Sequence, residues 1–244
     1  MKNYKMTIEY DGTRYNGWQR QKNTKNTIQE RFENVLSKMC GSNVEVFASG
    51  RTDAGVHASW QVANFKCLTD IECEEIMDYL NRYLPEDIRV TALSEAEERF
   101  HSRLNAVSKT YEYTIATKKT DVFRRKYVFA TDMSPDVEKM CHAAQSLTGT
   151  HDFKGFSSVG KTRKSTVRTV NFIEITQDKE IIKIRINANG FLYNMVRIIA
   201  GTLLEIGTGE LQEDIAEQIF EKKIRQMAGA TLPACGLCLK EVIY

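Results

Sequence analysis

The chain opens with a strict alternation of apolar and polar residues, which is typical of a strand with one buried face. The apolar positions of this segment are Tyr4, Met6, Ile8 and Tyr10. The Asp11-Gly12 pair that follows has the composition of a turn. An amphipathic helix is predicted next, because Thr27 and Glu30 form a capping box and Gly41 follows the last apolar residue. Its apolar positions, at helical spacing, are Ile28, Phe32, Val35, Leu36 and Met39.

The rest of the first half continues this pattern. Asp70 is expected to cap a second helix that ends before Pro85. The positions of this helix predicted to face inward are Ile71, Ile76, Leu80 and Tyr83. Further strands are predicted at residues 44–48, 61–65 and 88–92, with a glycine-flanked turn at 49–57. The order is therefore β-α-β-β-α-β, as in ferredoxin-like and RRM-like units.

The second half repeats this order without recognisable sequence identity to the first. Strands are predicted at 111–115, 166–175, 181–187 and 236–242, and helices at 191–205 and 214–222. A further helix is expected to begin with Ser134 as N-cap and Pro135 at N1 and to stop near Gly149. The predicted fold class is α+β, with two ferredoxin-like, RRM-like halves covering residues 1–105 and 106–244. We expect the halves to join into one mainly antiparallel sheet with a central active-site cleft.

Composition narrows the class of protein without naming a function. Hydrophobic residues make up 42% and charged residues 27%, which are ordinary values for a globular protein. No apolar run reaches the roughly 18 residues that a membrane helix needs. The first twelve residues lack the continuous apolar core of a signal peptide. We therefore expect a cytoplasmic protein.

The six cysteines are scattered through apolar surroundings, unlike the dense spacing of a disulfide scaffold, so we expect reduced thiols. Cys235 and Cys238 form a Cys-x-x-Cys pair, but no second pair of ligands lies at the spacing of a structural zinc site. We therefore expect no bound metal.

The net charge is only +2, so partners must be inferred from where the charges lie. Basic residues gather in two segments, at residues 118–126 and 151–168. Such runs are often no more than solvated surface. They favour an RNA partner only if other features of the chain do.

The segment GRTDAGVHA, at residues 50–58, is the most distinctive in the chain. An aspartate in a glycine-flanked turn usually serves the turn itself, so Asp53 alone indicates no function. The whole string, however, resembles the signature of the tRNA pseudouridine synthase A family. In that family this aspartate is the catalytic residue.

The resemblance extends over nearly the whole chain. The further matching motifs are Tyr10-Asp11-Gly12, residues 15–19, Phe100-His101-Ser102-Arg103, residues 109–113, His151-Asp152-Phe153, residues 188–197, residues 228–231 and Gly236-Leu237. Because these motifs keep one order, the chain is identified as resembling this family, and the pseudouridine synthase fold is implied.

The family chemistry implies which groups react. A target uridine loses its N1 glycosidic bond, its uracil turns, and the ring rejoins the ribose through C5. Since no redox change or group donor is involved, no cofactor or metal is implied. The carboxylate of Asp53 would either deprotonate C2′ of the ribose to give a glycal or attack covalently, and the sequence leaves both open.

Two more residues complete the implied catalytic set. Arg197 resembles the arginine that pairs with the catalytic aspartate and keeps it ionised. Tyr111 resembles the tyrosine that stacks on the flipped uracil. Tyr113 should share the face of Tyr111, so the motif alignment alone selects between them. The residues expected to bind substrate are Arg51, His57, Arg14, Arg20, Lys161, Arg163, Lys164 and Arg168.

The implied partner is tRNA, a structured RNA, with uridines of the anticodon stem-loop as the expected target and ribosomal RNA as an alternative. Family members are homodimers, so a homodimer is expected here. A non-catalytic module of two RRM-like halves is a rival interpretation, but no RNP1 pattern occurs. A metabolic enzyme that binds a small anion is another, but neither GxGxxG nor a P-loop pattern is present.

Overall fold

The opening alternation forms strand β1 (Lys2–Tyr10) in the computed structural model, which describes residues 1–118, 122–160 and 162–244. The chain divides into two units. The first unit contains Met1–Val107 and Leu239–Tyr244, and the second contains Ser108–Cys238. Within each unit the strands pair mainly antiparallel and helices cover them, so the predicted mixed α+β class is confirmed.

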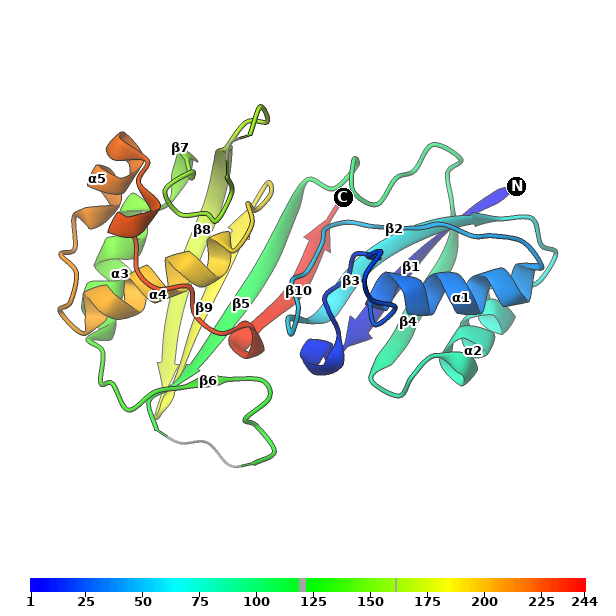
Figure 1. Ribbon diagram of the computed structural model, residues 1–244, viewed down its shortest axis with the longest axis horizontal. Coiled ribbons are helices and arrows are strands. Elements are labelled where there is room, and N and C mark those ends of the chain that lie inside the picture. Colours follow the sequence, from blue (N-terminus) through cyan, green and yellow to red (C-terminus); the bar gives the residue numbers. More distant parts are fainter. Residues whose placement is uncertain (119–121, 161) are drawn as a thin grey trace. The chain divides into compact units, whose positions relative to one another are not determined.

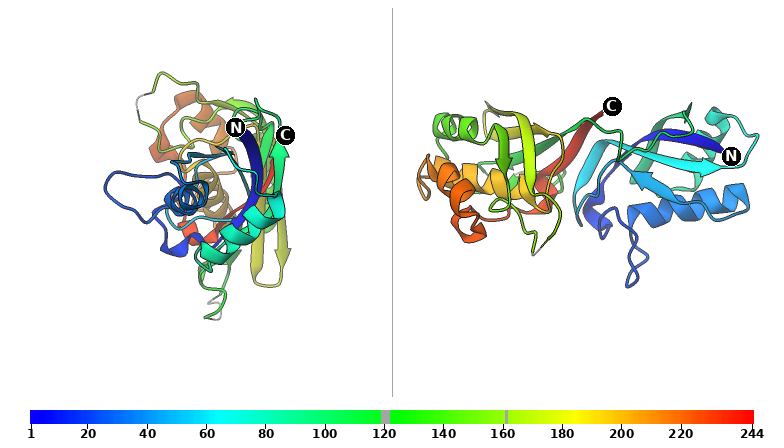
Figure 2. Two further views of the ribbon diagram at one scale, coloured as in Figure 1. Left: turned by 90° about the vertical axis from the view of Figure 1, so that its right-hand side faces the viewer. Right: turned by 90° about the horizontal axis from the view of Figure 1, so that it is seen from above.

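The first unit has the predicted β-α-β-β-α-β order. Its elements are β1, η1 (Gly12–Arg14), α1 (Ile28–Cys40), β2 (Val46–Ala48), β3 (His57–Cys67), α2 (Cys73–Tyr83) and β4 (Ile88–Ala96), with β10 (Leu237–Ile243) added from the end of the chain. The strands lie in the order β4-β1-β3-β10, and β2 pairs with the C-terminal part of β3. Helix α1 runs along one face of these strands (Figures 1 and 2).

Helix α1 begins and ends as its sequence predicts. The Thr27 side chain accepts a hydrogen bond from the backbone N–H of Glu30, and Gly41 ends the helix in the left-handed conformation, with φ of 64°. Phe32 and Leu36 of α1 and Met6 of β1 are all completely buried. The apolar face of β1 and the apolar face of α1 therefore both contribute to the core.

Helix α2 departs from prediction at its start and at one apolar position. It begins at Cys73, and its N-cap is Glu72, so the expected cap at Asp70 is wrong. Tyr83 was expected to face inward but is 57% exposed. Its ring packs against the ring of Tyr79, with 4.5 Å between centroids, instead of entering the core.

The segment after β4 crosses the opposite face of the first unit. Asn3 of β1 donates hydrogen bonds to the carbonyl oxygens of Glu97 and Phe100. Ser102 is fully buried and its backbone N–H donates to Asn64 of β3 at 2.9 Å. His101 packs against Phe47 of β2, with 5.2 Å between ring centroids. The Phe100-His101-Ser102-Arg103 motif therefore covers the face that the helices leave open.

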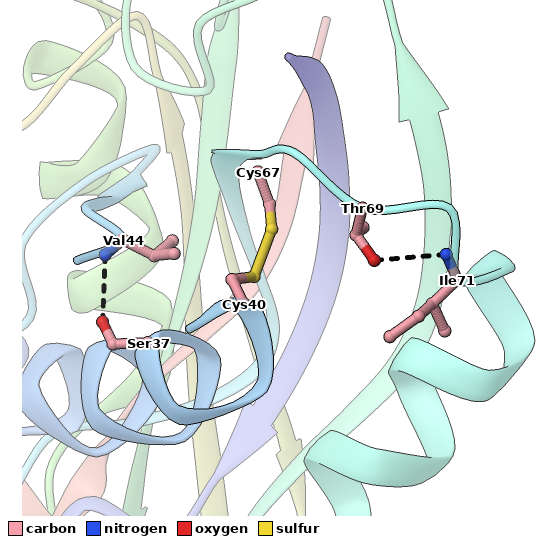
Figure 3. Close-up of a disulfide and its surroundings, with 6 residues drawn as sticks. All are labelled: Ser37, Cys40, Val44, Cys67, Thr69 and Ile71. Atoms are coloured by element: carbon pink, nitrogen blue, oxygen red, sulfur yellow. Dashed lines mark hydrogen bonds between the residues drawn. A yellow bond between two sulfur atoms is a disulfide. The ribbon is translucent and has the colours of Figure 1, made fainter. Parts of the chain in front are cut away.

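Cys40, the last residue of α1, and Cys67, the last residue of β3, form a disulfide (Figure 3). Their Cα atoms are 6.6 Å apart, within the range that a disulfide spans. The prediction of reduced thiols is wrong for this pair. The two residues are separated by 27 positions and meet only because the end of α1 lies beside the end of β3. The free cysteines of the described residues are Cys73, Cys141, Cys235 and Cys238.

The second unit is built on the strand order β5-β9-β8-β7, with β6 parallel to β5. Its elements are β5 (Ser108–Ala116), β6 (Phe129–Ala130), α3 (Val137–Ser146), β7 (Gly149–Asp152), β8 (Val167–Asp178), β9 (Ile181–Ala188), α4 (Met195–Gly207), α5 (Ile215–Lys222), η2 (Arg225–Met227) and η3 (Ala234–Gly236). The apolar helix α4 lies against the strands of this unit, and α3 packs against α4 (Figure 1).

Two helix starts in the second unit differ from prediction. Helix α3 is capped by Asp136, whose side chain accepts from the backbone N–H groups of Glu138 and Lys139, and not by Ser134. Helix α4 begins at Met195, four residues later than expected, because Asn194 adopts a left-handed backbone, with φ of 62°. No helix in the described ranges is both long and apolar enough to cross a bilayer.

Candidate active site

The turn that carries Asp53 connects β2 with β3 and is fixed by the first residues of the chain. The backbone N–H of Trp18 donates to the carbonyl oxygen of Thr52 at 3.0 Å, and the N–H of Gly55 donates to that of Tyr15 at 3.3 Å. The hydroxyl groups of Tyr10 and Thr52 share a hydrogen bond of 2.7 Å. The turn is therefore held on both sides of Asp53, at Thr52 and at Gly55.

Two glycines let the N-terminal segment approach this turn. A Cβ on Gly12 would lie 2.0 Å from the carbonyl oxygen of Val56, and a Cβ on Gly17 would lie 2.7 Å from that of Thr52. Gly17 also has a positive φ of 85°, which favours glycine. The motifs at residues 10–12 and 15–19 are thus spatial neighbours of GRTDAGVHA.

Strand β3 is irregular where it leaves the turn. Its register with β1 shifts between the pairs Ile8–Gln61 and Tyr10–Ala58, so β3 carries an extra residue there. Such bulges are common beside active sites, where they redirect side chains. Asp53 itself is half-buried, and the hydrogen bond from the N–H of Val56 to its carbonyl oxygen, 3.1 Å long, closes the turn.

The other predicted site residues of the first unit have different surroundings. Arg51 is exposed, whereas His57 is buried and its Nδ1 accepts a hydrogen bond from the N–H of Gly12. The Arg14 side chain is exposed and pairs with Asp87, and Arg20 pairs with Glu33. These two arginines have carboxylate partners that the sequence did not indicate.

Tyr111 and Tyr113 of β5 face the same side, as predicted, but their environments differ. The Tyr113 ring is completely buried, and its hydroxyl donates to the carbonyl oxygen of Pro233 at 2.7 Å. Burial raises the pKa of Tyr113 far above its usual value. Tyr111 lies edge-on to Phe191, with 5.1 Å between ring centroids. Both tyrosines are therefore buried, Tyr113 completely and Tyr111 with 7% of its surface exposed.

Arg197 lies in the first turn of α4 and is half-buried. Its Nε donates to the carbonyl oxygen of Leu232 at 2.6 Å, and its Nη1 donates to Oδ1 of Asn194 at 3.0 Å. The N-terminal end of a helix carries partial positive charge, which disfavours a cation there. An arginine in the first turn of α4 is therefore not explained as an ordinary solvent-facing residue. The guanidinium is held in a defined orientation.

Asp152 anchors the basic segment at residues 151–168. This carboxylate accepts from the hydroxyl of Thr166 at 2.5 Å and from the backbone N–H of Lys154, and it pairs with Lys223 at 2.8 Å. Burial raises the pKa of Asp152, but the hydrogen bonds from Lys223 and Thr166 outweigh it, and the pKa lies below its usual value. The sequence singled out the His151-Asp152-Phe153 motif without assigning this role to Asp152.

Within this segment Arg163 and Lys164 are exposed. Arg168 is half-buried, donates to the carbonyl oxygens of Ser165 and Val167, and has a pKa that burial lowers. Lys161 lies outside the described residues. Among the residues that the structure describes, no three His, Cys, Asp or Glu side chains gather as metal ligands.

Full-length relatives share about half of the sequence. The chain is 48% identical to "tRNA pseudouridine synthase A 1" of Clostridium tetani, 44% identical to "tRNA pseudouridine synthase A 2" of Bacillus cereus (strain ZK / E33L) and 46% identical to "tRNA pseudouridine synthase A" of Bacillus sp. (strain KSM-64). Each alignment has 245 positions and covers 100% of both chains.

A solved structure of a Cbf5-Nop10-Gar1 complex aligns with 97% of this chain and 48% of that chain, at 11% identity and a TM-score of 0.41. This chain spans about half the length of that one, and a likeness this weak supports no argument. A protein-family model described as "tRNA pseudouridine synthase" matches residues 6–105 and 143–244 of this chain. The matched residues include Asp53 and Arg197. With these two segments matched and relatives aligned from end to end, the chain belongs to the tRNA pseudouridine synthase family.

Proposed function

We propose that this protein isomerises uridine to pseudouridine in the anticodon stem-loop of tRNA and that Asp53 is its catalytic carboxylate. The names of its full-length relatives support tRNA as the substrate. The observation that carries the assignment of Asp53 is the anchoring of its turn, in which Thr52 and Gly55 are hydrogen-bonded to the N-terminal segment. A carboxylate on a fixed backbone is suited to meet a reacting sugar in one geometry.

The reaction conserves atoms and electrons. The bond between N1 and C1′ breaks, a bond between C5 and C1′ forms, the proton on C5 is lost, and N1 gains a proton. Asp53 acts either by removing the C2′ proton, which gives a glycal, or by attacking the ribose. Both routes need an ionised carboxylate, and neither needs a cofactor.

Tyr111 and Arg197 are proposed to act on the same nucleotide as Asp53. A planar ring can stack on uracil while the base turns, because stacking does not depend on how the base is rotated. Tyr111 is proposed for this role because it matches the family tyrosine, whereas the completely buried ring of Tyr113 suits packing. Arg197 is proposed to keep Asp53 ionised and oriented, a role that a guanidinium held by two acceptors supports.

The proposed RNA contacts fall into two groups. Arg51, Arg163 and Lys164 are exposed and suited to meet phosphates. Arg14 and Arg20 are paired with Asp87 and Glu33. Both guanidinium groups are exposed while their carboxylate partners are largely buried, so each arginine is proposed to keep its ion pair and to meet a phosphate with its remaining N–H groups. His57 and Arg168, which bond backbone groups of the protein, are proposed to contact RNA only where their remaining nitrogens reach it.

We further propose that the protein is a homodimer and acts in the cytoplasm. The proposal of a dimer rests on the family resemblance, and that of the cytoplasm on the expectation drawn above from the sequence. Light scattering on the purified protein should give twice the 27.9 kDa mass of one chain, and a single-chain mass would contradict the dimer. Fractionation of cells that express the tagged protein should place it with the soluble tRNA pool.

Tritium release tests the activity. We expect wild-type protein to release label from tRNA tritiated at uracil C5, and Asp53→Asn to release none while still binding tRNA. Asp78→Asn, the same change at an exposed aspartate of α2, is the matched control and should keep the wild-type rate. Full activity of Asp53→Asn would remove the catalytic assignment.

Mapping the product tests the target. Carbodiimide labelling followed by primer extension should place the new pseudouridines in the anticodon stem-loop of the transcript. A ribosomal RNA fragment incubated in parallel should remain unmodified. Modification of the ribosomal fragment, or of a different arm of the tRNA, would contradict the proposed target while leaving the reaction type intact.

A further inference from the structure

Asn194, the residue before α4, departs from local structural preference in two ways. Its backbone is left-handed, with φ of 62° and ψ of 5°, whereas an N-cap residue normally has an extended backbone. Its side chain makes no capping hydrogen bond to the helix, although asparagine is among the best capping residues. A left-handed backbone is uncommon for residues with a Cβ, although asparagine adopts it more readily than most. Such departures are expected where a residue serves function.

The Asn194 amide is engaged on both sides. Its Oδ1 accepts from Nη1 of Arg197, and its Nδ2 donates to the hydroxyl of Ser158, each at 3.0 Å. Because a guanidinium can only donate, the amide atom that faces Arg197 must be the oxygen. The nitrogen must then face Ser158, so chemistry fixes the orientation of the amide.

The second acceptor of Arg197 is fixed as firmly. The carbonyl oxygen of Leu232 accepts from Nε, and the chain leading to Leu232 packs directly on α4. The N–H of Gly229 donates to the hydroxyl of Thr202 at 3.0 Å, and a Cβ on Gly201 would lie 2.0 Å from the carbonyl oxygen of Ala230. Neither acceptor can therefore move freely, and together they set the guanidinium plane.

The same amide connects Arg197 with the segment that follows β7. Ser158 receives the side-chain hydrogen bond from Asn194, and its backbone N–H donates to the carbonyl oxygen of Tyr193 at 3.0 Å. Arg163 and Lys164, the exposed basic residues proposed to meet phosphates, follow in the same connection. The Asn194 side chain thus bonds both Arg197 and Ser158, and Ser158 precedes the proposed phosphate contacts Arg163 and Lys164.

We infer that Asn194 is a positioning residue for the reaction, which orients the Arg197 guanidinium and couples it to the residue 153–160 segment. This inference rests on the proposed function, in which Arg197 orients the catalytic carboxylate. The left-handed backbone is what brings the amide to that position, three residues before Arg197 and on the same side of the helix.

Asn194→Gly tests the inference, because glycine accepts the left-handed backbone and removes only the amide. We expect turnover in tritium release to fall about 10- to 100-fold, the loss typical of a hydrogen bond to a charged group, with KM for tRNA and the thermal midpoint little changed. Lys179→Gly, at another left-handed residue in the turn between β8 and β9, is the matched control and should keep full turnover.

A double-mutant cycle separates positioning from general damage. If Asn194 acts through Arg197, adding Asn194→Gly to Arg197→Ala should cause no further loss of turnover. Losses that add, or wild-type turnover of Asn194→Gly, would overturn the inference while leaving the proposed function standing. Wild-type turnover of Arg197→Ala would overturn the inference together with the role of Arg197. A wild-type protein that releases no tritium would overturn the proposed function itself.

Discussion

The backbone N–H of Gly12 donates a hydrogen bond to Nδ1 of His57 at 3.1 Å. It connects the end of β1 to the first residue of β3, immediately after the turn that carries Asp53. Asp11 Oδ1 also lies 3.2 Å from this nitrogen. The Gly12 N–H can only donate, so in this hydrogen bond Nδ1 is the acceptor.

His57 is therefore expected to be a structural acceptor. His57→Ala should lower the free energy of unfolding by about 1–3 kcal/mol, because the buried N–H of Gly12 loses its acceptor. His57→Asn offers an oxygen near the position of Nδ1 and should lose less. Urea unfolding measures both variants, and tRNA binding by the folded variants is the control. Weakened binding with unchanged stability would instead indicate direct contact with RNA.

The two tyrosines of β5 should separate stability from activity. Tyr113→Phe removes the hydrogen bond to Pro233 and should lower the free energy of unfolding by about 1 kcal/mol, with tritium release unchanged. The family resemblance implies that the Tyr111 hydroxyl also helps to remove the C5 proton. Tyr111→Phe should therefore lose tritium release at least about tenfold with its stability retained. The reverse pattern would assign Tyr113 to the site.

Asp152 should make stability depend on pH in the acid range. Since hydrogen bonds lower its pKa in the folded protein, its contribution is present above the unfolded pKa of about 3.9 and is lost as pH falls through the folded value. Asp152→Asn should therefore be less stable than wild type at neutral pH, and the difference should shrink below about pH 3.9.

Urea unfolding at neutral pH and below about pH 3.9 measures the difference in stability between Asp152→Asn and wild type, with Asp78→Asn as control. A difference that does not change with pH would contradict the assignment. The variant should also bind tRNA more weakly, because Asp152 anchors the segment that leads to Arg163 and Lys164.

The disulfide between Cys40 and Cys67 should add stability without adding activity. A disulfide across 27 positions stabilises a protein by about 3 kcal/mol, because it lowers the conformational entropy of the unfolded chain. Reductant should lower the thermal midpoint of the wild type but not that of Cys40→Ala. Cys73→Ala, at a free thiol, is the control and should respond to reductant as wild type does. Titration of six thiols without reductant would show that the bond is absent.

Local patterns predicted the elements of the fold well, but not the contacts between distant residues. The capping box and Gly41 define α1, since both signals act within a few residues of the helix ends. The start of α4 was missed because residues 191–193 continue the apolar pattern, whereas the helix begins only after the left-handed Asn194. The Cys40–Cys67 bond depends on how a helix packs beside a strand, which no local pattern encodes.

The same limit applies to the candidate site. The resemblance predicts Asp53 and Arg197 as site residues, but it does not predict which groups hold them in place. The turn around Asp53 is fixed by Tyr15 and Trp18, which precede it by more than thirty positions. Arg197 is fixed by Asn194 and Leu232, and the motifs contained Asn194 without indicating which way its amide points.

Strand β10 has a consequence for the order in which the protein is made. Residues 239–244 belong to the first unit and lie beside β3, yet the ribosome produces them after the whole second unit. During synthesis, the unit that contains Asp53 therefore lacks one of its strands for as long as residues 108–238 are being translated. We expect the nascent first unit to expose the edge of β3 until β10 is synthesised.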